Sequence, residues 1–122
     1  MVVLKEFEMR KFLVLSVVAA SLSAVSLAAQ APSAEKIKAG MKVYADQKCA
    51  TCHSVAGVGS KMSPLDGVGT KLTAADIKLW LTDPDTMAAK LAVKPKIKMK
   101  KYALPEADLD ALTSYLVSLK KK

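Results

Sequence analysis

The chain has 122 residues, a formal net charge of +8 and few aromatic residues, which make up 5% of the sequence. A basic charge could serve nucleic-acid binding, but no aromatic residues alternate with the lysines to stack on bases, so we expect no nucleic-acid partner. A structural zinc site takes four Cys or His ligands, and the sequence holds only two cysteines and one histidine. Acidic protein surfaces are the partners that this charge favours.

The first segment predicts export. Arg10 and Lys11 precede an apolar run rich in small residues, FLVLSVVAASLSAVSLAA, which is typical of a secretory signal peptide. We predict that residues 1–29 are a signal peptide, with Met9 as an alternative start, and that residues 30–122 form one small domain in the periplasm. The alternative is an uncleaved membrane anchor, although the run contains four serines and a spanning helix needs about 20 predominantly apolar residues.

The domain begins with a predicted helix over residues 33–49. Ser33 is a suitable N-cap, and Ile37, Met41 and Tyr44 recur at helical spacing, so we expect these three side chains to share the core-facing side. A core of Leu, Val, Ala and Met would be thin in so small a domain. We therefore expect a further group to fill its centre.

Both cysteines and the only histidine lie within five consecutive residues, CATCH. A disulfide between Cys49 and Cys52 would be the ordinary outcome in an oxidising compartment. A thioredoxin-like dithiol would accompany a strand–helix–strand pattern, and no convincing strand pattern is present. The interpretation that we prefer is C-x-x-C-H, the attachment signature of c-type haem, in which cysteines at i and i+3 of a helical turn face the same side and His53 follows to bind the iron.

With this motif the chain resembles the class I cytochromes c over about residues 34–119. The resemblance implies an all-α cytochrome c fold, with three to four short helices wrapped around one covalently bound haem c. It also gives a reason for Gly40, because in that family a glycine and an aromatic residue at these places let the N-terminal helix cross the C-terminal helix closely.

After the motif, residues 54–72 contain four of the five glycines and predict an irregular loop. In the family such a loop covers the histidine side of the haem, and a proline carbonyl in it accepts the imidazole N–H. The resemblance makes Pro64 the candidate for that role. The alternative is an ordinary turn proline.

A short helix is predicted over residues 72–84, with Thr73 and Asp76 in capping-box positions and Pro84 just beyond its end. Its apolar face comprises Ile77, Trp80 and Leu81. Trp80 is either simply a core residue or, as in the family, the donor of a hydrogen bond to a haem propionate.

The sixth iron ligand is expected to be a methionine, because the chain has no second histidine. Met62 lies too close to His53 to reach the opposite face of the haem, and Met87 occupies a helix exit, where methionine usually serves packing. Met99 lies in a segment that alternates lysine with apolar residues, so that Ile97 and Met99 should point inward. Class I cytochromes place their ligand methionine a few residues before the terminal helix, and we therefore predict Met99; the alternative is a soft core-filling role.

The last predicted element is a helix that begins near Pro105, with lysines 120–122 trailing beyond it. Its apolar stripe comprises Leu109, Leu112, Tyr115, Leu116 and Leu119.

These features predict a periplasmic electron-transfer protein, not an enzyme, that carries one electron on a haem c with His53 and Met99 as iron ligands. The alternatives are a cytochrome subunit of a periplasmic dehydrogenase or oxidase, or a haem-based sensor or peroxidase with a labile sixth ligand. Redox proteins with acidic docking surfaces are the expected partners, met as a monomer in transient complexes. The lysines expected to steer them surround the proposed ligand and are Lys90, Lys94, Lys96, Lys98, Lys100 and Lys101.

Overall fold

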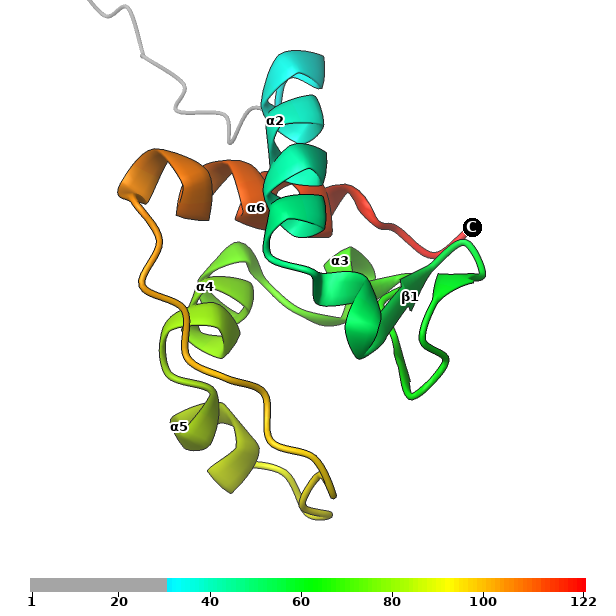
Figure 1. The fold of residues 1–122 in the computed structure, drawn as a ribbon, viewed down its shortest axis with the longest axis vertical. Coiled ribbons are helices and arrows are strands. Elements are labelled where there is room, and N and C mark those ends of the chain that lie inside the picture. The colour runs from blue at the N-terminus through cyan, green and yellow to red at the C-terminus, as the bar shows by residue number, and fades with distance from the viewer. Residues whose placement is uncertain (1–30) are drawn as a thin grey trace, which may run out of the picture. The chain divides into compact units, whose positions relative to one another are not determined.

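The computed structural model describes residues 31–122, so the predicted leader lies outside the described residues. In this part of the chain, five α-helices and one short 3₁₀ helix form most of the regular structure (Figure 1). They are α2 (Ala34–Asp46), η1 (Cys49–Thr51), α3 (Val68–Lys71), α4 (Ala74–Thr82), α5 (Pro84–Ala89) and α6 (Glu106–Ser118). The predicted all-α class is confirmed, although the helices outnumber the three to four expected. Within residues 31–122 no helix has the length and apolar character needed to cross a bilayer.

Helices α2 and α6 cross at Gly40 (Figure 1). A Cβ added there would lie 2.6 Å from the Cβ of Tyr115 and closer still to the carbonyl oxygen of Ala111. These distances are well inside van der Waals contact, so only glycine lets the two helices approach this closely. Beside the crossing, the rings of Tyr44 and Tyr115 pack edge to face with their centroids 5.6 Å apart. The close crossing that the family resemblance implied is confirmed.

The core lies where α2, α4 and α6 meet. Its buried residues are Val43, Ile77, Leu81, Leu112, Tyr115 and Leu116. The predicted apolar stripe of α6 is therefore confirmed, and so are Ile77 and Leu81 of α4 but not Trp80. The prediction for α2 is partly wrong, because Met41 is 51% exposed and Val43 is buried. The contact with α6 centres on Gly40, and a helix turns about 100° per residue. Residue 41 is thereby carried away from the contact and residue 43 is brought back to it.

Capping residues set the starts of α2 and α4 as predicted. Ser33 Oγ accepts the backbone N–H of Lys36 at 3.2 Å. At α4, Thr73 Oγ1 accepts the N–H of Asp76, and the Asp76 carboxylate accepts the N–H of Thr73, each at 3.1 Å. Side chains therefore pair one N–H group at the start of α2 and two at the start of α4.

Pro84 ends α4 as predicted but also begins α5, a helix that was not predicted. The Asp83 carboxylate caps α5 by accepting the N–H of Thr86 at 3.3 Å and its hydroxyl at 2.6 Å. Proline suits the first helical position, because its missing N–H would have no partner there in any case. The chain therefore turns at Asp83 and starts a second short helix directly.

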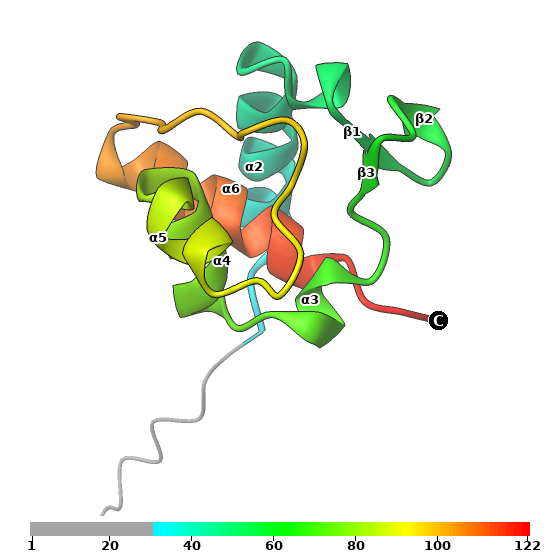
Figure 2. The same cartoon turned by 90° about the horizontal axis from the view of Figure 1, so that it is seen from below.

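Residues 54–72 are more regular than the predicted loop. Strand β1 (His53–Val55) pairs antiparallel with β2 (Val58–Gly59) and parallel with β3 (Ser63–Pro64), and α3 follows (Figure 2). Strands of two or three residues are too short to show the alternation of apolar and polar residues by which strands are predicted. The sheet is held by long-range pairing that the local sequence does not reveal.

The lysines that follow α6 are fixed against α3, so the expectation that they trail freely is wrong. The N–H of Gly69 donates to the carbonyl of Leu119 at 3.0 Å. The N–H of Lys121 donates to Thr70 Oγ1 at 2.9 Å, and Lys120 Nζ donates to the carbonyl of Gly69 at 2.5 Å. The two bonds of Lys120 and Lys121 join residues 51 positions apart, which no local pattern could indicate.

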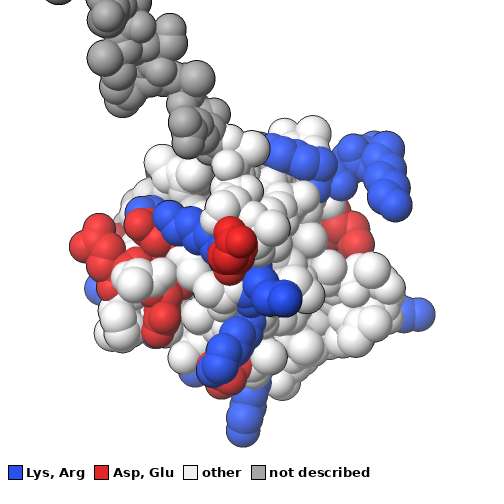
Figure 3. All heavy atoms as spheres, turned by 90° about the horizontal axis from the view of Figure 1, so that it is seen from above, with Lys and Arg blue, Asp and Glu red and all other residues white. Residues whose placement is uncertain are grey.

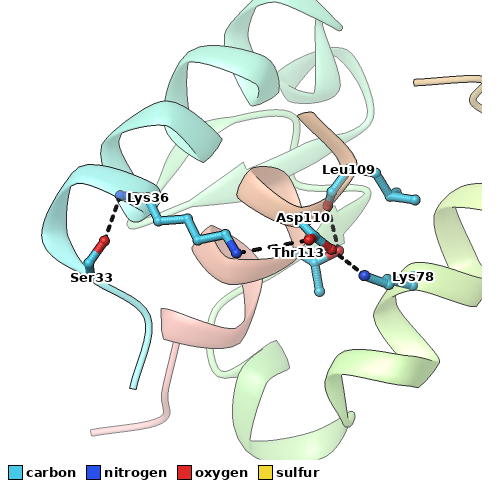
Figure 4. Close-up of polar contacts among 6 residues, drawn as sticks. All are labelled: Ser33, Lys36, Lys78, Leu109, Asp110 and Thr113. Atoms are coloured by element: carbon cyan, nitrogen blue, oxygen red, sulfur yellow. Dashed lines mark hydrogen bonds and ion pairs between the residues drawn. The ribbon is translucent and has the colours of Figure 1, made fainter. Parts of the chain in front are cut away.

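Asp110 links three helices (Figure 4). From α6 its carboxylate pairs with Lys36 of α2, where N and O are 3.9 Å apart, and more closely with Lys78 of α4. The hydrogen bond from Lys78 is the main cause that lowers the pKa of the Asp110 carboxyl, and the charges of Lys78 and Lys36 add to it. The ion pairs are partly exposed to water, so each contributes modestly.

Replacing Asp110 with asparagine should lower the free energy of unfolding at pH 7 by a small but measurable amount. The native pKa of Asp110 is depressed, so its stabilising effect is fully present above the unfolded pKa of about 4 and is lost as the pH falls through the native value. Urea unfolding of the holoprotein and of Asp110→Asn should therefore give curves that differ at pH 7 and converge below about pH 3. A difference that persists unchanged at low pH would contradict the ion-pair origin.

Candidate functional site

The two cysteines lie on one tight turn. Helix η1 covers Cys49–Thr51, Cys52 follows as its C-cap, and the N–H of Cys52 donates to the carbonyl of Cys49 at 3.2 Å. In a 3₁₀ turn, side chains three residues apart are eclipsed, so both sulfur atoms leave the backbone on the same side. Cys49 is buried, Cys52 is exposed and both are free thiols, so the disulfide alternative is absent from the structure.

His53 follows this turn as the first residue of β1. Its Nδ1 lies 2.8 Å from the carbonyl oxygen of Ser63. A carbonyl can only accept, so Nδ1 carries the proton and the lone pair of Nε2 stays available to a metal. The register of β1 and β3 aligns His53 with Ser63 and thereby brings this carbonyl to the ring.

The prediction that the Pro64 carbonyl accepts the imidazole N–H is wrong by one residue. In the register of the sheet, Pro64 is opposite Ser54 rather than His53. The glycine-rich sequence does not determine the register of β1 against β3 to within one residue. The register, and with it the carbonyl that reaches His53, is set only in the folded sheet.

Met99 is partly buried and packs against the core cluster. Three residues later, the N–H of Tyr102 donates to the carbonyl of Leu81 at 2.8 Å, which ties this segment to the end of α4. Burial raises the pKa of the Tyr102 phenol, and the neighbouring thiols of Cys49 and Cys52 raise it further. The segment that carries Met99 thus returns to the C-x-x-C-H turn, although the two are distant in sequence.

The other two candidate methionines are placed differently. Met62 is 61% exposed and directly precedes Ser63, so it lies on the Nδ1 side of the imidazole, away from Nε2. Met87 is 7% exposed within α5, where Lys90 Nζ lies 3.8 Å from its sulfur. These positions agree with the arguments that set both aside.

Two apolar residues near the site depart from expectation. Ile97 was expected to point inward with Met99, but it is 59% exposed, so the simple alternation holds for Met99 alone. Trp80 is partly buried, yet it is not among the described residues that pack against the core cluster. Its position therefore does not match the core role, and its contact with a propionate stays a prediction.

A buried hydroxyl beside Cys49 has no partner. Tyr44 Oη makes no hydrogen bond within the described residues. Burial is the largest cause that raises the pKa of Tyr44 to about 12, followed by the charge of Cys49. An unpaired buried hydroxyl costs about 1–3 kcal/mol, so its presence indicates that a further group belongs next to this cysteine.

These residues fit a haem c. Two free thiols point to the same side, an imidazole offers Nε2, a thioether returns from the segment before α6, and an unpaired phenol lies alongside. Sequence reasoning missed Ser63, Tyr44 and Tyr102 as parts of this site. Tyr102 had one usable signal, as an aromatic residue in the same lysine-rich segment as Met99, whereas Ser63 had none.

A different metal centre has no support in the described residues. Within residues 31–122, no three or more side chains of His, Cys, Asp or Glu gather closely enough to hold a metal ion.

Comparison with known proteins agrees with this geometry. The family model described as Cytochrome c matches residues 37–120, which is more than half of the chain. No curated protein and no solved structure gives a match. Members of this family carry covalently attached haem c and usually serve as electron carriers. The chain therefore belongs to the cytochrome c family and is a haem-binding electron-transfer protein of the class I type.

Proposed function

We propose that this protein is a periplasmic electron carrier, not an enzyme, in which Cys49 and Cys52 attach one haem and His53 and Met99 bind its iron. The observation that supports this most is the turn at η1, which aligns both thiols and is followed directly by an imidazole with a free Nε2. The family match indicates that the cofactor is haem c, and Cys49, Cys52 and His53 are the residues that would attach it and bind its iron.

The residues of the chain hold and tune the cofactor. The carbonyl of Ser63 fixes the ring plane and the tautomer of His53, and the hydrogen bond increases the basicity of Nε2. Bound haem c exchanges one electron between Fe(III) and Fe(II), at a reduction potential that methionine ligation raises. If His53 and Met99 both bound the iron, the chain would leave no open ligand position for a substrate, which favours a carrier over a peroxidase or sensor.

Export is supported by the sequence. The proposed leader, residues 1–29, lies outside the described residues, and the apolar run after Arg10 and Lys11 is its signature. Members of the cytochrome c family are typically exported. A periplasmic site would also suit a cofactor held by two cysteine thioethers, which cannot be oxidised to a disulfide.

Mass spectrometry of the protein isolated from the periplasmic fraction tests export and attachment together. The intact mass should equal that of the polypeptide from residue 29 or 30 plus one haem, and thiol reagents should label neither cysteine. A chain that retains its leader would reject cleavage and favour the membrane anchor, and absence of the protein from the periplasmic fraction would reject export. A haem-free chain with a Cys49–Cys52 disulfide would reject the attachment.

Replacing Met99 with alanine should abolish the methionine-to-iron charge-transfer absorption of the oxidised protein. The same variant should have a lower reduction potential and should bind small exogenous ligands such as imidazole, because the sixth position becomes open. Optical spectra, potentiometry and ligand titration of the purified holoprotein measure the three effects.

Two control variants separate Met99 from its competitors. Met62→Ala changes an exposed methionine, and Met87→Leu keeps the volume of a buried one, so neither should alter the absorption band. If the band survives in Met99→Ala and disappears in Met87→Leu, the sixth ligand is Met87 and the present assignment fails.

We also propose that the lysine-rich segment between α5 and α6, residues 90–101, is the docking face for acidic redox partners. Leu91, Val93 and Ile97 are 42%, 83% and 59% exposed among its lysines. A small apolar centre with a charged rim is the usual anatomy of a protein interface. Carriers need fast association and fast release, which a small interface with charge steering provides.

The lysines of this segment differ in how free they are. Lys94 Nζ donates to the carbonyls of Ala88 and Ala89, and Lys98 pairs with Asp85 at 3.2 Å. Lys100 Nζ lies over the ring of Tyr102, 4.7 Å from its centroid. Lys96 and Lys101 make no ion pair among the described residues, so they should contribute most to steering.

Charge alone does not define this face, because lysine side chains are spread widely over the face of the molecule that Figure 3 shows. A test must therefore compare variants of equal net charge. We choose Lys96→Glu with Lys101→Glu, and as a matched control Lys38→Glu with Lys61→Glu, which are exposed lysines of α2 and of the turn before β3.

Oxidation of the reduced holoprotein by ferricyanide, an anionic oxidant, should be about tenfold slower in the Lys96/Lys101 variant than in the control at low salt. Oxidation by a cationic cobalt(III) complex should become faster in that variant, and both effects should shrink as salt shortens the screening length to about 8–10 Å. The reduction potentials should stay nearly unchanged. Equal rates in the two variants would show that only net charge matters and that residues 90–101 are not the docking face.

A further inference from the structure

A surface hollow lies between the C-terminal tail and α3, away from the residues of the haem site. It has a volume of about 400 Å³, which falls within the range of about 300–1,000 Å³ common for small-ligand sites. Its walls include Asp66, Gly67, Leu119 and four lysines, namely Lys71, Lys120, Lys121 and Lys122. Figure 2 shows the tail leaving α6 and passing α3, where the hollow forms.

The lysines of this hollow are held in place by the fold. Lys121 is fixed through its own N–H, which donates to Thr70 Oγ1 at 2.9 Å, so its side chain is free for other contacts. Lys71 is the last residue of α3. Glycine at position 67, with φ of +74°, allows the chain to enter α3 at this point. The ammonium groups therefore start from fixed backbone positions rather than from a loose tail.

The positive charge of the hollow is only partly neutralised within the described residues, because four lysines share one carboxylate, that of Asp66. Lys71, Lys121 and Lys122 make no ion pair there, and Lys120 bonds only a neutral carbonyl, that of Gly69. The one acidic residue, Asp66, uses its Oδ1 to accept the N–H of Ala56 at 2.8 Å. Four ammonium groups around one small hollow repel one another, and an anion that bridges them would relieve that repulsion.

A second hollow, beside α5, shows what a neutralised arrangement looks like. It has a volume of about 340 Å³ and contains Lys94 and Lys98. There Lys98 pairs with Asp85, and Lys94 donates to two carbonyls at the end of α5. The two hollows are similar in volume, but the lysines of the hollow beside α5 already have partners within the protein. An anion would therefore stabilise the hollow at α3 more than the hollow beside α5.

We infer that the hollow lined by Lys71, Lys120, Lys121 and Lys122 is a binding site for a phosphate-bearing ligand with at least two negative charges. Lysine ammonium groups bind phosphate oxygens through charge-assisted hydrogen bonds. The ligand is either a small soluble phosphorylated molecule or the phosphate headgroup of a lipid. The site is separate from the iron ligands and from residues 90–101, so it stands whether or not the proposed docking face is correct.

Calorimetric titration of the holoprotein with inorganic pyrophosphate at low salt tests the site. One pyrophosphate should bind per protein, and Lys71→Gln with Lys121→Gln should weaken its affinity about tenfold or more, because two charge-assisted contacts are lost. The matched control, Lys38→Gln with Lys61→Gln, removes the same charge from exposed positions outside the hollow and should change the affinity less than about threefold. Both replaced side chains of the test variant are exposed and Lys121 keeps its backbone bond, so folding should be retained, as the haem absorption spectrum will show.

A parallel titration with vesicles of phosphatidic acid, whose phosphomonoester headgroup can carry two negative charges, distinguishes the two sources of phosphate. Saturable pyrophosphate binding that the Lys71/Lys121 variant loses assigns a soluble ligand. Vesicle binding that the same variant loses, without pyrophosphate binding, assigns a lipid headgroup. Equal loss in test and control variants, or saturable binding of neither probe, would overturn the site.

Discussion

The close crossing of α2 and α6 at Gly40 is the constraint on which the rest of the structure depends. Helix α2 leads through Gln47 and Lys48 directly into η1, so the position of α2 against α6 determines where Cys49 lies. Gln47 and Lys48 continue the hydrogen-bonding of the helix, with N–H groups bonded to Val43 and Ala45. Lys48 then adopts a left-handed conformation with φ of 55° and turns the chain into the 3₁₀ helix. One glycine contact therefore sets the geometry of a chemical motif nine residues later.

The methionine side of the site is positioned from the same helix by a second route. Helix α4 packs on α6 through the core and through the ion pair of Lys78 with Asp110. The carbonyl of Leu81 near the end of α4 binds the N–H of Tyr102, which holds the segment that carries Met99. The turn that carries Cys49 and the segment that carries Met99 are thus both positioned by contacts with α6. A change in the packing of α6 would move them relative to each other. This explains why a site made of segments far apart in sequence can stay well defined in a small core.

Two lysine-rich segments, residues 90–101 and the tail after α6, look alike in sequence but differ in how the fold uses their side chains. In residues 90–101 several ammonium groups are used within the fold, on the carbonyls at the end of α5, on Asp85 and on the ring of Tyr102. In the tail after α6 the backbone is tied down while most ammonium groups remain without an ion pair in residues 31–122. A count of lysines could not separate these cases, because it contains no information about where the chain places their partners.

The sequence by itself determined the helical class, the caps at Ser33 and Thr73, the apolar stripe of α6 and the chemistry of C-x-x-C-H, because all of these depend on residues within one or two helical turns. Tertiary structure alone decided that Val43 rather than Met41 faces the core. It decided that the carbonyl of Ser63, rather than that of Pro64, accepts the hydrogen bond from Nδ1–H of His53. It also decided that the last lysines lie against α3. Each of these depends on the rotation of a helix, the register of a two-residue strand or a hydrogen bond across 51 residues. Such features depend on packing between segments that lie apart in the sequence, and local sequence patterns do not predict the free energy of that packing.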